Sequence, residues 1–218
     1  MKKWILSIAL STMVSFAYAD VEHSEKVEIR SFSPVETDYM PPSEVETKHL
    51  KVVGMKITGF SGASQTKIDQ AFEVLEKVVN SEEFKDRVIN FKNTKGERAF
   101  ASNLGLSNEQ IYEQFMEGRE TLQPNTPGEM NFYLKLYNKF WSRVIGYTSP
   151  DINTINMNWK FFKNYRPSDV AGNLAHEWTH KLGFDHRSAQ EHDSAPYAIG
   201  YIVDELGLKY LSQKQELP

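Results

Sequence analysis

The sequence predicts an α+β fold, on the strength of its composition and of the order in which its apolar periodicities change. Of the 218 residues, 40% are hydrophobic and 25% are charged, which is typical of a globular protein with a buried core. From residue 49 onward, the apolar spacing is strand-like, then helix-like, then strand-like again, with a helical segment near the C-terminus. Strands and helices that occur in separate runs favour α+β, and we expect one domain over residues 49–218.

The first ordered elements are a strand and two helices. Val and Ile are abundant over residues 50–60, which predicts a strand. Ser64 is expected to cap a helix that runs to about Asn80, because the apolar residues recur at helical spacing: Ile68, Phe72, Leu75 and Val79. A second helix is expected between Ser107, which fits a capping box with Gln110, and residue 118, a glycine.

The middle of the chain predicts further strands. The stretch 83–100 fits neither periodicity, and residues 119–129 contain two prolines and a glycine that indicate a loop. Alternating or β-branched residues then predict three strands, over residues 130–136, 141–148 and 155–159.

The N-terminus has the features of an export signal. Lys2 and Lys3 precede a short apolar stretch that ends in Ala-Tyr-Ala at residues 17–19. This is typical of a signal peptide over residues 1–19. We therefore expect an exported protein, periplasmic or secreted, without stable membrane association after cleavage. The polar, proline-containing residues 20–48 are expected to be a flexible segment or a pro-segment.

Charge and cysteine content narrow the function classes. The formal net charge is −4 and there is no cysteine. The acidic balance argues against a nucleic-acid partner, and we expect a monomer that acts on a protein or peptide. Without cysteine, a thiol nucleophile and a thiolate metal site are excluded, so histidine and carboxylate side chains must bind any transition metal.

One segment concentrates the chemistry, because four of the six histidines lie between residues 176 and 192. His176 and His180 are four residues apart, which places both rings on one face of a helix. Gly183 can take the left-handed conformation that ends a helix, and the turn would bring His186 back as a third ligand. Three protein nitrogens with one open position are typical of a catalytic zinc site. Glu177, next to the first ligand, can accept a proton from a zinc-activated water.

Other assignments near this segment also have to be weighed. Asp185 has ligand chemistry and could replace His186, but the spacing favours the histidine. His192 could be an additional ligand or a proton donor, and is expected to be a solvated loop residue. Ser168 is expected to be the N-cap of the helix that carries the first two ligands.

The segment from His176 to His186 resembles the zinc-binding signature of the metzincin metallopeptidases, H-E-x-x-H-x-x-G-x-x-H. This resemblance implies a mixed twisted sheet backed by two long helices, an active-site helix and a small C-terminal subdomain. It also implies a zinc-dependent endopeptidase that holds an extended peptide in the cleft between these parts, with one catalytic Zn²⁺ and with Glu177 as general base.

The chain also departs from that family. Metzincins have a methionine turn beneath the zinc, whereas no methionine follows Met157 here. Residues 194–201 occupy the corresponding region, with Ala195, Ala198 or Ile199 as the expected apolar floor of the turn. Tyr197, or alternatively Tyr201, would stabilise the transition state.

These departures indicate an outlying bacterial-type branch of the family. They leave two further interpretations open. One is an exported zinc protein that recognises peptides without turnover. The other is an effector protease with a single substrate.

Overall fold

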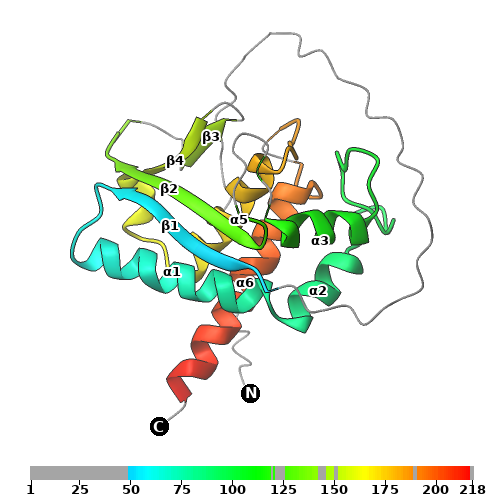
Figure 1. The fold of residues 1–218 in the computed structure, drawn as a ribbon, viewed down its shortest axis with the longest axis horizontal. Coiled ribbons are helices and arrows are strands. Elements are labelled where there is room, and N and C mark those ends of the chain that lie inside the picture. Colours follow the sequence, from blue (N-terminus) through cyan, green and yellow to red (C-terminus); the bar gives the residue numbers. More distant parts are fainter. Residues whose placement is uncertain are drawn as a thin grey trace, which may run out of the picture.

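The protein has the α+β fold that the sequence predicts (Figure 1). The computed structural model describes residues 49–118, 120, 126–141, 146–149, 152–188 and 191–216. The expected signal peptide, residues 1–19, and the segment 20–48 lie outside the described residues. Among the described helices, none combines the length and apolar character that a membrane span requires.

A four-stranded mixed sheet forms one layer, with the strand order β1-β2-β4-β3. β1 (Lys51–Thr58), β2 (Glu129–Tyr137) and β4 (Ile152–Asn158) are parallel. The short strand β3 (Gly146–Ser149) is antiparallel to β4 and forms one edge of the sheet. All four predicted strands are therefore confirmed, although the third was expected to begin earlier, at residue 141, and residues 142–145 lie outside the described part.

Six helices complete the described fold, and the two that were predicted in the first half are confirmed. α1 (Ala63–Val79) has Gly62 as its N-cap, so the expectation that Ser64 caps this helix was wrong. Ser64 lies in the first turn, where its hydroxyl donates to the Ser61 carbonyl. α3 (Asn108–Glu117) has the predicted capping box between Ser107 and Gln110 and ends at Gly118, whose φ is 68°. The stretch that fitted neither periodicity contains α2 (Glu82–Ile89). The remaining helices are α4 (Trp159–Phe162), α5 (Pro167–Lys181) and α6 (Ala195–Glu216).

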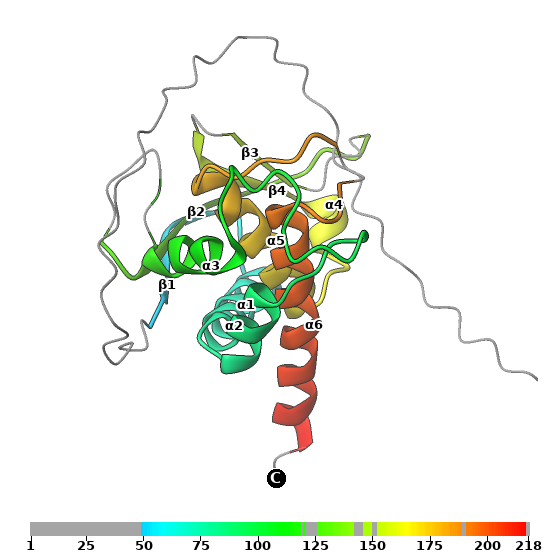
Figure 2. The same cartoon turned by 90° about the vertical axis from the view of Figure 1, so that its right-hand side faces the viewer.

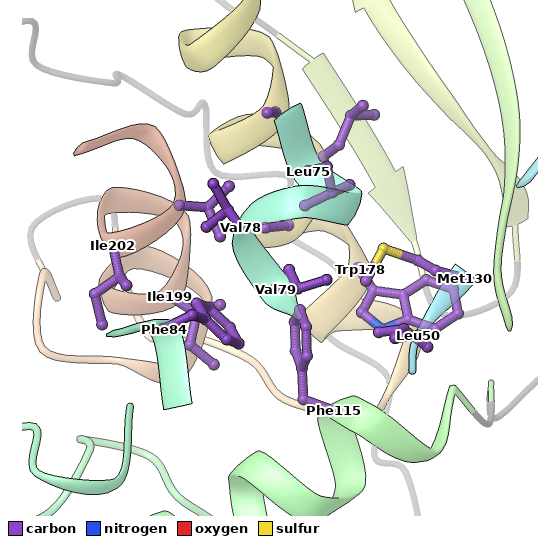
Figure 3. Packing of buried hydrophobic residues seen from close by; sticks show 14 of the residues in the cluster. Leu50, Leu75, Val78, Val79, Phe84, Phe115, Met130, Trp178, Ile199 and Ile202 are labelled. Carbon is purple, nitrogen blue, oxygen red and sulfur yellow. The ribbon is translucent and has the colours of Figure 1, made fainter. Parts of the chain in front are cut away.

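The core lies between the sheet and the helices α1, α5 and α6, which gather on one side of the sheet in both views (Figures 1 and 2). Met130, Phe132 and Leu134 alternate along β2 and are all buried, as the strand period of two requires. The Phe132 ring lies 5.7 Å from Phe72 of α1 and 5.8 Å from Trp178 of α5. Figure 3 shows Trp178 among the buried side chains that join these layers. The sheet thus fixes the position of α5.

Two glycines allow α5 and α6 to touch through their backbones. A Cβ atom on Gly172 would lie 2.6 Å from the Gly200 carbonyl oxygen, and one on Gly200 would lie 3.0 Å from the Gly172 carbonyl oxygen. No larger residue fits at such a distance without a shift. The region where a small C-terminal subdomain was expected is therefore a single long helix that packs directly on α5.

Candidate metal centre

The local sequence explains where α5 begins. Pro167 occupies the first helical position, where a missing N–H costs nothing, and Arg166 is the N-cap. The Asp169 carboxylate accepts a hydrogen bond of 2.7 Å from the Arg166 backbone N–H. The expectation that Ser168 caps this helix was wrong, because Ser168 lies fully buried in the first turn. Proline at the helix start was the signal that could have corrected it.

The end of α5 is a Schellman turn, and it has the predicted glycine. Gly183 has φ of 94°, its N–H donates to the His180 carbonyl at 3.0 Å, and the Phe184 N–H donates to the Thr179 carbonyl at 3.1 Å. This pair of bonds defines the motif. Phe184 is buried next to the turn, so the chain leaves α5 in one direction and returns towards the helix at His186.

Three histidines converge as the sequence predicts. The Nε2 atoms of His176 and His180 are 3.2 Å apart, and one nitrogen from each of His176, His180 and His186 lies within 4.8 Å of the other two. In a tetrahedral site with Zn–N bonds of about 2.0–2.1 Å, two ligand nitrogens are about 3.3 Å apart. The donor set therefore fits one zinc ion, with His176 and His180 already near their required separation.

Hydrogen bonds to backbone carbonyls orient two of the rings. His180 Nδ1 lies 2.9 Å from the Phe184 carbonyl oxygen, and the His176 ring donates to the Pro196 carbonyl. A carbonyl only accepts, so the His180 proton is on Nδ1 and its Nε2 lone pair faces the cluster. Outer contacts of this type fix the tautomer of metal-binding histidines.

The environment keeps these rings neutral. Burial lowers the pKa of His176 well below its ordinary value, and the neighbouring His180 and His186 lower it further, whereas the Pro196 carbonyl opposes the shift. Burial also lowers the pKa of His180. Neutral imidazole is the form that binds a metal. At neutral pH a metal ion could therefore bind without first displacing a proton from either of these two rings.

Glu177 points from α5 towards the edge strand. It is 1% exposed, and burial raises the pKa of its carboxyl group to about 8, while a hydrogen bond from the Thr148 backbone of β3 opposes the shift. A divalent cation at the histidine cluster would favour the carboxylate form and lower this pKa. The contact joins the general-base candidate to the strand at the sheet edge, which the sequence alone did not reveal.

The alternative ligands lie outside the cluster. Asp185 is exposed, and its carboxylate accepts from the His186 backbone N–H at 2.7 Å. His192 Nδ1 lies 3.1 Å from the Tyr201 hydroxyl. Within the described part of the chain, the three predicted histidines form the one group that could hold a metal ion.

Tyr197 lies much closer to the cluster than Tyr201. Its ring is 2% exposed and its centroid lies 4.7 Å from those of both His176 and His186. Tyr201 is one helical turn further along α6 and packs on Tyr197 at 6.1 Å. The segment expected to form a turn with an apolar floor is instead the first turns of α6, with Ala195, Ala198 and Ile199 buried.

A second loop supports the segment that carries the third histidine. The Glu191 carboxylate accepts from the Arg187 backbone N–H at 2.6 Å and from the Ser102 hydroxyl at 3.1 Å. The Ala101 N–H donates to the Asp193 carbonyl at 2.8 Å. The Ser102 and Ala101 contacts link residues about 90 positions apart, so no local pattern could have predicted these two.

A buried ion pair fixes the last turn of α5. The Lys181 ammonium lies 3.1 Å from Glu120, 2.7 Å from Asn153 Oδ1 of β4 and 3.3 Å from the Asn131 carbonyl of β2. The Lys181 and Glu120 side chains are 3% and 2% exposed. Because Lys181 follows His180 directly, this pair ties a ligand-bearing turn to two strands.

Comparison with protein families, with curated proteins and with solved structures gave no match. The eleven-residue motif and the geometry around it are therefore the features that indicate a function.

Proposed function

We propose that the protein is an exported, zinc-dependent endopeptidase of the metzincin type. The observation that carries this proposal is the convergence of His176, His180 and His186, with two Nε2 atoms 3.2 Å apart at the spacing of a tetrahedral zinc site. Two of the ligands come from one helical face, and the Schellman turn at Gly183 returns the third. The mixed sheet with an antiparallel edge strand is compatible with the architecture that the motif resemblance implies.

The residues around the cluster suit peptide hydrolysis. The three histidines would hold the zinc ion, which would supply Lewis acidity and activate a water molecule near neutral pH. Glu177 is adjacent to the first ligand and is held by the Thr148 backbone, so its carboxylate can accept a proton and then deliver it to the leaving amine. Tyr197, between His176 and His186, is the proposed donor to the developing oxyanion.

The substrate would pair with the edge strand β3. The neighbouring strand β4 is paired on both sides and offers no edge to a peptide. In the described sheet β3 is the edge strand next to β4, and it contributes the Thr148 contact to Glu177. An extended peptide can add to such an edge through main-chain hydrogen bonds, which would bring its backbone next to the general base.

Metal analysis and a cleavage assay test the proposal together. We expect about one zinc per chain, and cleavage of unfolded casein that stops with a chelator and returns with zinc. Glu177→Ala should retain zinc and lose cleavage by roughly 10²–10⁴-fold, the usual contribution of a general base. His49→Ala, an exposed histidine outside the cluster, serves as the matched histidine control and should keep both properties.

Each outcome separates the interpretations. Stoichiometric zinc without cleavage of casein or of a mixed peptide library would favour the binding protein without turnover. Zinc with cleavage of one protein only would indicate the single-substrate protease. A chain that binds no zinc, or a Glu177→Ala protein with full activity, would refute the mechanism.

A further inference from the structure

One segment of this acidic protein is strongly basic. The whole chain has 25 basic and 29 acidic residues, but residues 130–168 contain six Lys or Arg and a single acidic residue, Asp151. This segment runs from β2 through β3 and β4 to the start of α5. The charge asymmetry is therefore confined to one part of the fold.

The same segment exposes its aromatic side chains. Trp141 is 89% exposed, Phe140 is 68% exposed and Trp159 is 38% exposed. The Phe140 and Trp141 rings meet edge to face at 5.2 Å, and the Lys160 ammonium lies 5.8 Å from the Phe140 ring. We call these four residues, together with the exposed Lys139, the aromatic-basic patch.

The patch is held together by the fold, although it comes from two separate segments. The Lys139 N–H donates to Asn158 Oδ1 at 3.2 Å, and the Asn158 amide donates to the Lys139 carbonyl at 3.2 Å. Asn158 itself is fully buried and also caps α4. This pair of bonds fixes the loop after β2 against the start of α4, so the Phe140 and Trp141 rings lie beside Lys160.

We propose that the aromatic-basic patch docks the protein on an anionic lipid surface. Trp and Phe rings enter the boundary between headgroups and acyl chains, while lysines remain with the anionic headgroups. A soluble polyanion would match the charge but offers no apolar layer for Trp141 and Phe140. A neutral apolar ligand would match the rings but not the lysines, so an anionic membrane surface is the partner that satisfies both.

This peripheral docking differs from the expectation that the mature chain has no stable membrane association, and it does not depend on the proposed peptidase activity. Binding at a membrane surface strengthens with the apolar area that is buried and with attraction to anionic lipids, and the patch supplies both. The attachment is reversible and weakens at high salt, because the electrostatic part is screened within about 10 Å at 0.1 M ionic strength.

Vesicle sedimentation and tryptophan fluorescence test the proposal. The protein is purified after export, with its N-terminus determined by mass spectrometry, and mixed with vesicles of phosphatidylcholine alone or with phosphatidylglycerol added. We expect binding to the anionic vesicles only, with a blue shift in emission that Trp141→Phe reduces, because Trp141 is the more exposed of the two tryptophans in the patch. Lys139→Gln and Lys160→Gln should each weaken binding about fivefold, which corresponds to about 1 kcal/mol per basic residue near an anionic surface.

Matched variants elsewhere provide the controls. Leu104→Ser removes a side chain that is 64% exposed outside the patch, and Lys95→Gln removes an exposed charge outside it; both should bind like the unmodified protein. Equal binding to neutral and anionic vesicles would overturn the proposal. So would absence of binding, or binding to polyglutamate or an oligonucleotide without binding to vesicles.

Discussion

Replacing Gly172 by alanine tests the close contact between α5 and α6. Gly172 lies in the middle of α5, four residues before His176, and a Cβ there would lie 2.6 Å from the Gly200 carbonyl oxygen. The obstacle is backbone, which cannot rotate away as a side chain could. To accommodate the methyl group, α6 must move away from α5, and Pro196 and Tyr197 must move with it.

Two opposing effects set the size of the change. Alanine is favoured over glycine within a helix by about 0.8–1 kcal/mol, so an unobstructed site would become more stable. Overpacking a tightly packed contact costs about 1–3 kcal/mol. The steric cost should exceed the helix propensity, and we expect a net loss of up to about 2 kcal/mol in the free energy of unfolding.

Urea denaturation of chelated and zinc-loaded protein measures both consequences. The chelated variant should unfold at lower urea concentration. Zinc should stabilise it less than the unmodified protein, because His176 loses its contact with the Pro196 carbonyl as α6 shifts. Ser212→Ala, at an exposed position of α6, reports helix propensity without a steric effect. A more stable Gly172→Ala protein with unchanged zinc affinity would refute the reasoning.

Three further changes test the surroundings of the site. Lys181→Met should lower the free energy of unfolding by about 3–5 kcal/mol, because it leaves the buried Glu120 carboxylate without its partner. The double variant Lys181→Met/Glu120→Gln should recover part of this loss. If the single and double variants were equally destabilised, the pairing of Lys181 with Glu120 would be contradicted. The pKa of Asp204 is raised from 3.8 to about 6, mainly by burial and also by a neighbouring carboxylate. The folded state then binds this proton more tightly than the unfolded chain does. The free energy of unfolding, relative to that of the Asp204→Asn variant, should therefore fall by up to about 3 kcal/mol as the pH rises from 4 to 7. If the two proteins differed in melting temperature by the same amount at every pH, this reasoning would be refuted. Glu191→Ala removes the acceptor of the Arg187 N–H and of the Ser102 hydroxyl and should weaken zinc binding about tenfold in a competition assay; unchanged zinc affinity would contradict a supporting role for this loop.

The parts of the site that the sequence predicted are those set by local geometry. His176 and His180 share a face because a helix has 3.6 residues per turn, and Gly183 marks the end of that helix because glycine tolerates a positive φ. The capping box at Ser107 was equally local. The wrong assignment of Ser168 as N-cap was also a local matter. Pro167 occupies the first helical position and Asp169 bonds the Arg166 backbone, and together these two residues place the start of α5 one residue before Ser168.

The supports of the site were not predictable because they are backbone groups from distant segments. The Thr148 contact to Glu177 requires that β3 lie at the sheet edge, and the Pro196 contact to His176 requires that α6 cross α5 at two glycines. The eleven-residue motif from His176 to His186 contains no residue that indicates either of these two arrangements. Gly172 and Gly200, each inside a helix where glycine is unfavourable, were the one indication of a close helix contact.

The division between local and distant contributions also explains how the site can hold a metal without cysteine or a methionine turn. The ligand spacing is fixed by α5 and its terminal turn. The ring orientations are fixed by two carbonyls, one from that turn and one from α6. Tyr197 fills the space beside His176 and His186 with a buried aromatic ring, so the floor beneath the cluster is a helix packed through glycine contacts. Preorganisation of this kind reduces the structural change that metal binding must drive. The same packing makes zinc affinity sensitive to the α5–α6 distance, which is the property that the Gly172→Ala variant measures.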